Sequence, residues 1–150
     1  MAGIIKNNVL NEYLLTEISP LTPAEFKEIS KKNGWRFDWT VEFTHLQRQV
    51  FKVTVTKHPT IIQGIISLEL KPDHVYIHLI ESAPFNIGRN KLYSGVALTL
   101  VGYARQLSQK HGGGGCVQFI AEPELVNHYI KNWVAGPLGK LLMVLPAATA

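Results

Sequence analysis

One segment of the sequence constrains the fold more than any other, and it spans residues 80–104. An apolar strand pattern runs into a loop that contains Gly88, Arg89 and Lys91, and this loop opens into an amphipathic helix with Gly-Val-Ala at 95–97. The amides of a first helical turn have no partner within the helix, and the helix dipole adds about half a positive charge there. This order of strand, basic loop and helix N-terminus therefore predicts a site for a phosphate-bearing ligand.

The helix after this loop has a clear apolar periodicity. Apolar side chains recur at positions 93, 96, 97, 100, 101, 104 and 107, which is the spacing of one helical face. We therefore expect a helix over residues 93–111, ended by four glycines at 112–115. These glycines precede a predicted strand and lack the Lys-Ser/Thr pair of a phosphate-binding loop, so we interpret them as a helix-to-strand connection.

A second helix is predicted over residues 22–33 from its capping residues. Thr22 fits the N-cap, Pro23 fits the first helical position, and Glu25 completes a capping box. Gly34 follows the expected end, where glycine adopts the left-handed conformation that ends many helices. We therefore expect this helix to precede the main run of strands.

Alternating or continuous apolar patterns predict strands in several segments. Residues 9–18 have an ambiguous pattern that fits a strand. A third helix is expected to start at Pro123 and to run to about Trp133. The predicted strands cover residues 36–44, 48–57, 61–70, 74–81, 116–121 and 141–145. These elements predict an α/β fold of the α+β type, with a mixed, mostly antiparallel sheet flanked by helices in a single domain of residues 1–150.

Composition narrows the class of protein. Apolar residues make up 46% of 150, which predicts a globular domain with a substantial core. The net charge of +4 suits an anionic ligand, but it is too diffuse to indicate nucleic acid, so we expect no nucleic-acid partner. Cys116 is the single cysteine, and the sequence shows neither a signal-peptide pattern nor an apolar stretch near the roughly 20 residues that span a bilayer. We therefore expect a cytoplasmic protein with no membrane partner.

Two other kinds of site find little support in the sequence. His74 and His78 share a strand face, but a metal site needs at least a third ligand, so we expect no metal. A Gly-x-Ser-x-Gly elbow for a nucleophilic serine does not occur.

From about residue 61 to 145, the chain resembles a divergent bacterial branch of the GCN5-related N-acetyltransferase (GNAT) superfamily. Gly95-Val96-Ala97 matches the second half of the Gln/Arg-x-x-Gly-x-Gly/Ala motif that begins the family's long helix. Tyr129 stands ahead of Gly136, similar to the family's tyrosine before a Gly-Phe-like stop. Two positions depart from the pattern: Leu92 occupies the Gln/Arg position, and the loop before Gly95 is longer.

The resemblance implies acetyl transfer from acetyl-coenzyme A to a primary amine, on a small molecule or a peptide, by direct attack in a ternary complex. The cofactor would enter between the strands at 74–81 and 116–121, where parallel strands splay in this family. Tyr129 matches the tyrosine that protonates the departing thiolate, with a core aromatic as the alternative. The cofactor-binding residues are then expected to be Arg89, Asn90, Lys91, Tyr93, Ser94, Gly95, Val96 and Ala97.

The base that accepts the ammonium proton is less closely defined. Glu81 is the best candidate, because it ends the central strand near the expected position of the acetyl group, and it could act directly or through water. His78 is a weaker candidate, of a residue type that is a common general base in enzymes. An ion pair of Glu81 with Arg89 or Lys91 is the structural alternative to catalysis.

Three classes of function stay open. The departure at Leu92 is compatible with a non-catalytic GNAT-fold binding module that has kept or lost coenzyme A. A small basic nucleic-acid binder would show a steep salt dependence of binding. The sequence carries no motif that identifies the acceptor amine. Candidate residues to line the acceptor pocket are Trp35, Trp39 and His45, with core packing as the alternative for the two tryptophans. A homodimer is left open.

Overall fold

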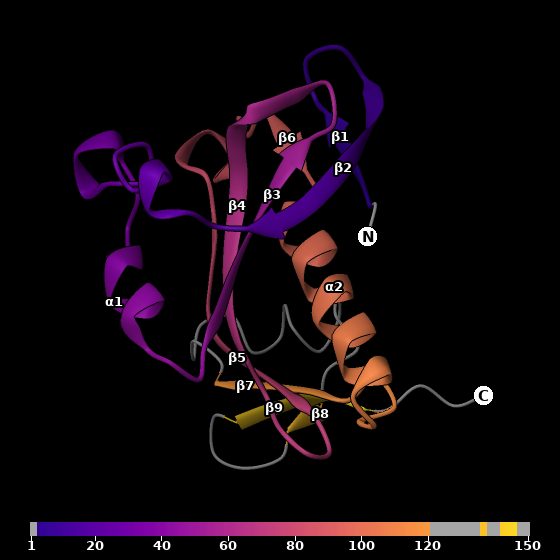
Figure 1. Cartoon of the computed structure of the whole chain (residues 1–150). Coiled ribbons are helices and arrows are strands. Elements are labelled where there is room, and N and C mark those ends of the chain that lie inside the picture. The colour runs from indigo at the N-terminus through magenta and orange to yellow at the C-terminus, as the bar shows by residue number, and fades with distance from the viewer. Residues whose placement is uncertain (1–2, 121–135, 138–141, 147–150) are drawn as a thin grey trace. The chain divides into compact units, whose positions relative to one another are not determined.

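The computed structural model describes residues 3–120, 136–137 and 142–146 (Figure 1). Its strands form one mixed sheet in the order β6-β1-β2-β3-β4-β5-β7-β9-β8. The strands are β1 (Ile4–Asn7), β2 (Glu12–Pro20), β3 (Gln49–Val55), β4 (His58–Leu70), β5 (Val75–Ser82), β6 (Tyr93–Ser94), β7 (Val117–Ile120), β8 (Gly136–Pro137) and β9 (Leu142–Leu145). The pair β5–β7 is parallel, whereas β1–β2, β1–β6, β2–β3, β7–β9 and β8–β9 are antiparallel. The expected fold class, a mixed and mostly antiparallel sheet with helices, is confirmed.

The chain forms two compact units that share long elements. The first unit contains residues 1–67 and 79–102, and the second contains residues 68–78 and 103–150. Three elements, β4, β5 and the helix α2 (Val96–Lys110), run from one unit into the other. In the part of the chain that the structure describes, no helix is long and apolar enough to cross a membrane.

The segment predicted as a helix over residues 22–33 forms two short 3-10 turns instead, Pro23–Glu25 and Lys31–Asn33. Its predicted start is correct in detail, because the backbone N–H of Thr22 donates to Oε1 of Glu25 at 3.0 Å. The helix fails because the side chain of Asn33 donates to the backbone carbonyl of Lys27 at 2.8 Å, which gives that carbonyl a partner outside a helical ladder. The side chain of Asn33 thus competes with backbone N–H groups for the carbonyl that a helix would use.

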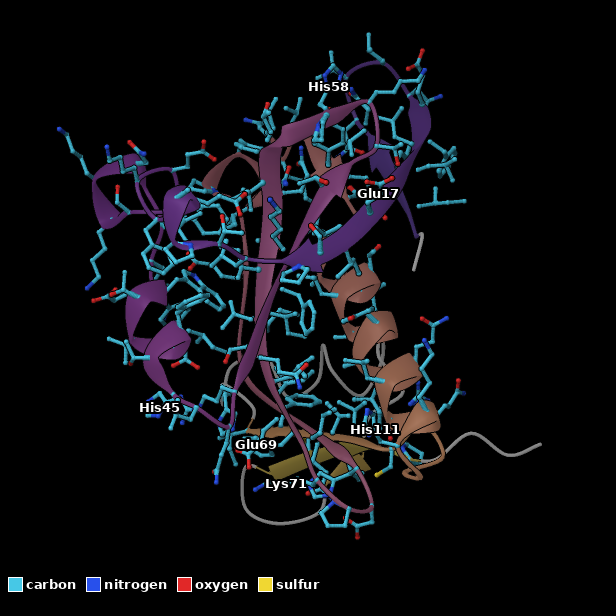
Figure 2. All side chains as sticks on the ribbon, viewed as in Figure 1. Glu17, His45, His58, Glu69, Lys71 and His111 are labelled. Carbon is cyan, nitrogen blue, oxygen red and sulfur yellow. The ribbon has the colours of Figure 1, made fainter. Side chains whose placement is uncertain are left out.

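The strand predicted over residues 36–44 is wrong, because residues Trp39–Thr44 form the helix α1. Asp38 caps this helix by accepting a hydrogen bond from the backbone N–H of Thr40 at 3.1 Å. Trp39 and Glu42 are both buried and lie three positions apart in the sequence, which is the spacing of a helical face. His45 follows α1 and is exposed (Figure 2). The helix is only six residues long, so the two-residue period of a strand and the 3.6-residue period of a helix cannot be distinguished from the sequence pattern.

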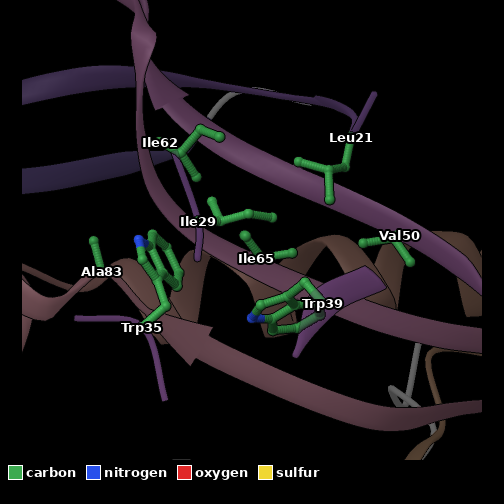
Figure 3. Close-up of a cluster of buried hydrophobic side chains, with 8 residues drawn as sticks. All are labelled: Leu21, Ile29, Trp35, Trp39, Val50, Ile62, Ile65 and Ala83. Atoms are coloured by element: carbon green, nitrogen blue, oxygen red, sulfur yellow. The ribbon is translucent and has the colours of Figure 1, made fainter. Parts of the chain in front are cut away.

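The core of the first unit gathers side chains from β3, β4 and the segment before α1. Trp35 and Trp39 keep only 5% and 1% of their surfaces exposed, so core packing accounts for both tryptophans. Figure 3 shows the cluster, which consists of Leu21, Ile29, Trp35, Trp39, Val50, Ile62, Ile65 and Ala83. The cluster attaches the irregular segment between β2 and β3 to the sheet.

The strands predicted at 48–57, 61–70 and 74–81 are confirmed as β3, β4 and β5. The ambiguous segment at 9–18 contributes to β2, which pairs with β1, a strand that the sequence pattern did not reveal. Residues 93–94 belong to β6 rather than to the predicted helix, and α2 begins only after Gly95, whose φ of 93° ends the strand.

In the second unit, β7 has a parallel partner on one side and an antiparallel partner on the other. Val75 to Ile77 of β5 pair with Val117 to Phe119 of β7, and β7 pairs on its other side with β9. The predicted strands at 116–121 and 141–145 are thereby confirmed. The four glycines 112–115 connect α2 to β7 as expected. The helix predicted from Pro123 to Trp133 lies outside the described residues.

Candidate functional site

The loop between β5 and α2 is held at its base by one buried asparagine. The side-chain amide of Asn86, which is 6% exposed, donates to the backbone carbonyl of Gln63 at 3.1 Å and to Gln63 Oε1 at 2.9 Å. Asn86 Oδ1 accepts a hydrogen bond from the backbone N–H of Tyr93 at 3.0 Å. One side chain therefore ties the start of the loop both to β4 and to the end of the same loop.

The far side of the loop is held by the turn between β1 and β2. Asn8 Nδ2 donates to the carbonyl of Lys91 at 3.0 Å and to Ser94 Oγ at 2.8 Å. The backbone N–H of Asn8 donates to the carbonyl of Leu92 at 2.9 Å, and the N–H of Leu92 donates to the carbonyl of Phe85 at 2.7 Å. Leu92, at the family's Gln/Arg position, is thus fixed through both of its backbone groups.

Between these anchors the loop is open to solvent. Residues 87–91 are all exposed, and Gly88, at φ 86°, has open space where a side chain would begin. Arg89 and Lys91 carry the two positive charges of this stretch, and Asn90 lies between them. The sequence placed all three in the ligand site, and the structure places them on one anchored loop that faces water.

The N-terminus of α2 follows the loop directly. Its first intrahelical bond runs from the N–H of Thr99 to the carbonyl of Gly95 at 3.0 Å, so the amides of Val96, Ala97 and Leu98 precede the helical ladder. Gly95 is the residue before the helix rather than part of its first turn. Leu98, which the sequence analysis did not include, is the third residue whose amide precedes the helical ladder. An exposed basic loop next to these amides can bind a phosphate group.

A glycine on β4 sets how closely α2 packs on the sheet. A Cβ at Gly64 would lie 2.6 Å from Cγ1 of Val96 and 3.1 Å from the carbonyl oxygen of Glu81. Only a residue without a side chain allows this approach. Glycine inside a buried strand was the available sequence signal for this close contact. Gly64 therefore positions the start of α2 next to the end of β5.

Glu81 is buried, with 6% of its surface exposed, and its carboxylate accepts several N–H groups. Oε2 accepts the backbone N–H of Arg36 at 2.6 Å, and Oε1 accepts the indole Nε1–H of Trp39 at 2.8 Å and the N–H of Phe37 at 3.3 Å. These partners come from the segment before α1 rather than from the loop cations. Glu81 therefore holds that segment against the end of β5, and its role as a base stays a prediction.

The other base candidate, His78, lies in a charged cluster of the second unit. His78 Nε2 lies 2.9 Å from Oε1 of Glu69, and Nζ of Lys71 lies 2.7 Å from Oε2 of the same carboxylate (Figure 2 labels Glu69 and Lys71). The hydrogen bonds from Lys71 and then from His78 lower the pKa of Glu69 below its usual value. Tyr129, the predicted acid, lies outside the described residues.

Within residues 3–120, 136–137 and 142–146, no group of three or more His, Cys, Asp or Glu is arranged to hold a metal ion. His74, which the sequence paired with His78, instead places Nδ1 2.7 Å from Oδ1 of Asp73.

The sheet order, the parallel β5–β7 pair and the loop that leads into α2 together define the fold of the GNAT superfamily of N-acetyltransferases, and this chain has that fold. The ribosomal-protein-S18-alanine N-acetyltransferase from Escherichia coli is similar in structure, with a TM-score of 0.63 and 13% identity over 90% of this chain and 96% of that one. Nourseothricin acetyltransferase is similar with a TM-score of 0.62 and 14% identity, covering 89% of this chain and 99% of its own.

A third similar structure was solved with a ligand. It is the PaiA N-acetyltransferase from Thermoplasma acidophilum in complex with coenzyme A, with a TM-score of 0.57 and 10% identity over 87% of this chain and 98% of that one. No family model and no curated protein matches the sequence. The likeness therefore lies in the fold rather than in the sequence.

Proposed function

We propose that residues 1–150 act as one catalytic domain, an N-acetyltransferase that moves an acetyl group from acetyl-coenzyme A to a primary amine of a small molecule or a peptide. The observation that carries the proposal is the anchored basic loop next to the first-turn amides of α2, within a GNAT fold. A structural neighbour crystallised with coenzyme A supports an acyl-coenzyme A donor. We expect a cytoplasmic enzyme that works without a metal ion, a nucleic acid or a membrane.

The residues of the loop fit the pyrophosphate of coenzyme A. Arg89 and Lys91 supply positive charge without burial, and the amides of Val96 and Ala97 supply donors that the helix does not use. An added Cβ at Gly95 would meet no atom closer than 3.7 Å, so the backbone there is open to close approach. Asn90, Tyr93 and Ser94 complete the proposed binding set.

In the proposed reaction an amine attacks the thioester directly within the ternary complex, and the chain's own groups move the protons. Acetyl-coenzyme A supplies the activated acyl group when it is bound. Tyr129 is proposed to protonate the thiolate. Glu81 is proposed as the base, and because its oxygens already accept three N–H groups, it would act through a water; His78 is the alternative.

Thermal unfolding with and without acetyl-coenzyme A tests the binding step. At about 100 times its dissociation constant, the ligand should stabilise the protein by roughly 2.7 kcal/mol, which raises the unfolding temperature. A double Arg89→Ala, Lys91→Ala variant should need more ligand for the same shift. No shift of the wild-type protein at millimolar ligand would exclude the proposal.

A second candidate function is favoured by Leu92, which lacks the polar side chain of the family motif. It is a non-catalytic module that keeps the fold and binds coenzyme A without turnover. Release of free thiol, followed with a panel of amines, distinguishes the two functions. Ligand-induced stabilisation without thiol release from any amine would favour the module, and release with one amine class would identify the acceptor.

A further inference from the structure

The outward face of the β1–β2 hairpin is apolar and exposed. Ile4, Tyr13 and Leu15 keep 59%, 71% and 60% of their surfaces exposed. They share one face because Ile4 pairs with Leu15 and Lys6 pairs with Tyr13 in the antiparallel register. Contiguous exposed apolar side chains on a sheet mark interaction surfaces.

The alternate residues of the hairpin point into the first unit. Ile5 is 1% exposed and Thr16 is fully buried, and Thr16 Oγ1 accepts a hydrogen bond from the N–H of Gly3 at 3.0 Å. The register is therefore fixed by the inner face, and the outer apolar side chains cannot turn inward without breaking it.

Charges flank the apolar centre of this face symmetrically. Nζ of Lys6 lies 5.9 Å from the ring centroid of Tyr13, one cross-strand pair away from Ile4–Leu15 on the side of the turn. Glu17 is exposed on the opposite side, two residues beyond Leu15 on β2 (Figure 2). Two residues of a strand span about 7 Å, so the cation and the carboxylate lie at nearly equal distances from the Ile4–Leu15 pair.

We propose that this hairpin face, defined by Ile4, Lys6, Tyr13, Leu15 and Glu17, binds a second copy of the chain. A two-fold axis through the Ile4–Leu15 pair, with the two β2 strands antiparallel, stacks the apolar centres on each other. The same axis brings Lys6 to the partner's Glu17 and Glu17 to the partner's Lys6. An isologous interface requires such a self-complementary patch.

Charge complementarity is the reason to assign the partner as a second copy. Each face carries one cation and one carboxylate on opposite sides of an apolar centre, so a copy rotated by 180° matches both charges at once. An apolar centre with charges at its edge is the usual organisation of a protein interface.

Sedimentation velocity over about 1–100 µM protein tests the proposal, because this range brackets micromolar dissociation constants. The wild-type chain should dimerise, and Leu15→Asp should weaken the dimer by about 100-fold or more, because it places a charge at the apolar centre. Val41→Asp is the matched control, since Val41 is 50% exposed on α1 and lies outside the hairpin face. Circular dichroism checks that both variants keep the fold.

A charge exchange tests the two-fold register itself. Lys6→Glu and Glu17→Lys should each weaken the dimer by about tenfold, because each turns two attractive pairs into repulsive ones. The double variant restores opposite charges and should recover most of the affinity. A monomeric wild-type chain, a dimer unaffected by Leu15→Asp, or a double variant as weak as the single ones would each overturn the proposal.

Discussion

Two glycine-bearing loops adjoin α2, and they differ in their charges and in the contacts that hold them. The loop before α2 is held by the side chains of Asn86 and Asn8, exposes Arg89 and Lys91, and leads into the amides that precede the helical ladder of α2. The loop after α2, residues 112–115, is held by backbone bonds such as that from the N–H of Gly113 to the carbonyl of Ser108 at 2.8 Å.

The difference shows what an anion site requires. The second loop has more glycines, and three of them have positive φ, but it has no charged residue and follows the negative end of the helix dipole. The first loop has fewer glycines, with cations and polar anchors instead. We therefore expect helix polarity and fixed donors, rather than the number of glycines, to favour phosphate binding by the first loop.

The largest effect is expected from Gly64→Ala, which would break the packing that holds the first loop next to the sheet. The new methyl would lie 2.6 Å from Cγ1 of Val96, and such overpacking costs about 2–3 kcal/mol of unfolding free energy. Urea unfolding measures it. Gly88→Ala is the control, since Gly88 has open space and only its φ of 86° opposes alanine, at about 1 kcal/mol. Equal costs would contradict a close approach at Gly64.

Asn86→Ala should come next, because it removes the hydrogen-bond partner of the N–H of Tyr93 and of Gln63 Oε1, whereas the carbonyl of Gln63 still accepts from the N–H of Ala83. We expect a loss of about 1–3 kcal/mol in unfolding free energy together with weaker binding of acetyl-coenzyme A. Calorimetry and denaturant unfolding measure the two effects. Asn90→Ala, at an exposed position of the same loop, should change stability by less than about 0.5 kcal/mol. Unchanged ligand affinity in Asn86→Ala would show that the anchor does not position the loop.

Removal of the loop cations should affect binding without affecting stability. In Arg89→Ala, Lys91→Ala, we expect affinity for coenzyme A to fall by about 10–100-fold, since both side chains are exposed and serve no contact in the core. Added salt should weaken the wild-type complex more than that of the variant. Lys110→Ala, at the other end of α2, is the control that should leave affinity unchanged. A variant that binds as tightly as the wild type would place the ligand elsewhere.

The smallest effect is expected for the pH dependence of stability, through Glu69 in the second unit. Because Lys71 and His78 lower the pKa of Glu69, its stabilising contribution is present above the unfolded pKa of about 4.3 and is lost as pH falls through the lower folded pKa. Glu69→Gln should therefore reduce the loss of stability on acidification below about pH 4.5. Identical profiles for wild type and Glu69→Gln would contradict this assignment.

Local signals predicted most of this fold. Alternation identified β3, apolar strand patterns identified β4 and β5, and the 3.6-residue period identified α2. The segment 36–44 failed because aromatic residues at 35, 37 and 39 imitate alternation, whereas Asp38, an N-cap residue, was the available helix signal. β1 is only four residues long, too short to carry a period.

The residue types of the candidate site could be predicted from the sequence, but the long-range hydrogen bonds that hold it could not. Arg89, Lys91 and the glycine before the helix are adjacent in sequence, so a local motif reveals them. The contact of Asn8 with Lys91 joins residues 83 positions apart, and the contact of Glu81 with Trp39 joins residues 42 apart. Such contacts depend on how strands pair, which no local pattern records.

The hydrogen bonds of Asn8 have a consequence for motion. The carbonyls of Lys91 and Leu92 accept hydrogen bonds from Asn8 in the turn between β1 and β2, so we expect the motion of the loop before α2 to be coupled to that of the β1–β2 hairpin. Ordering the hairpin lowers the entropy that the loop would lose on binding a ligand. We expect Asn8→Ala to speed amide hydrogen exchange in residues 87–94, and unchanged exchange would show that the two segments fluctuate independently.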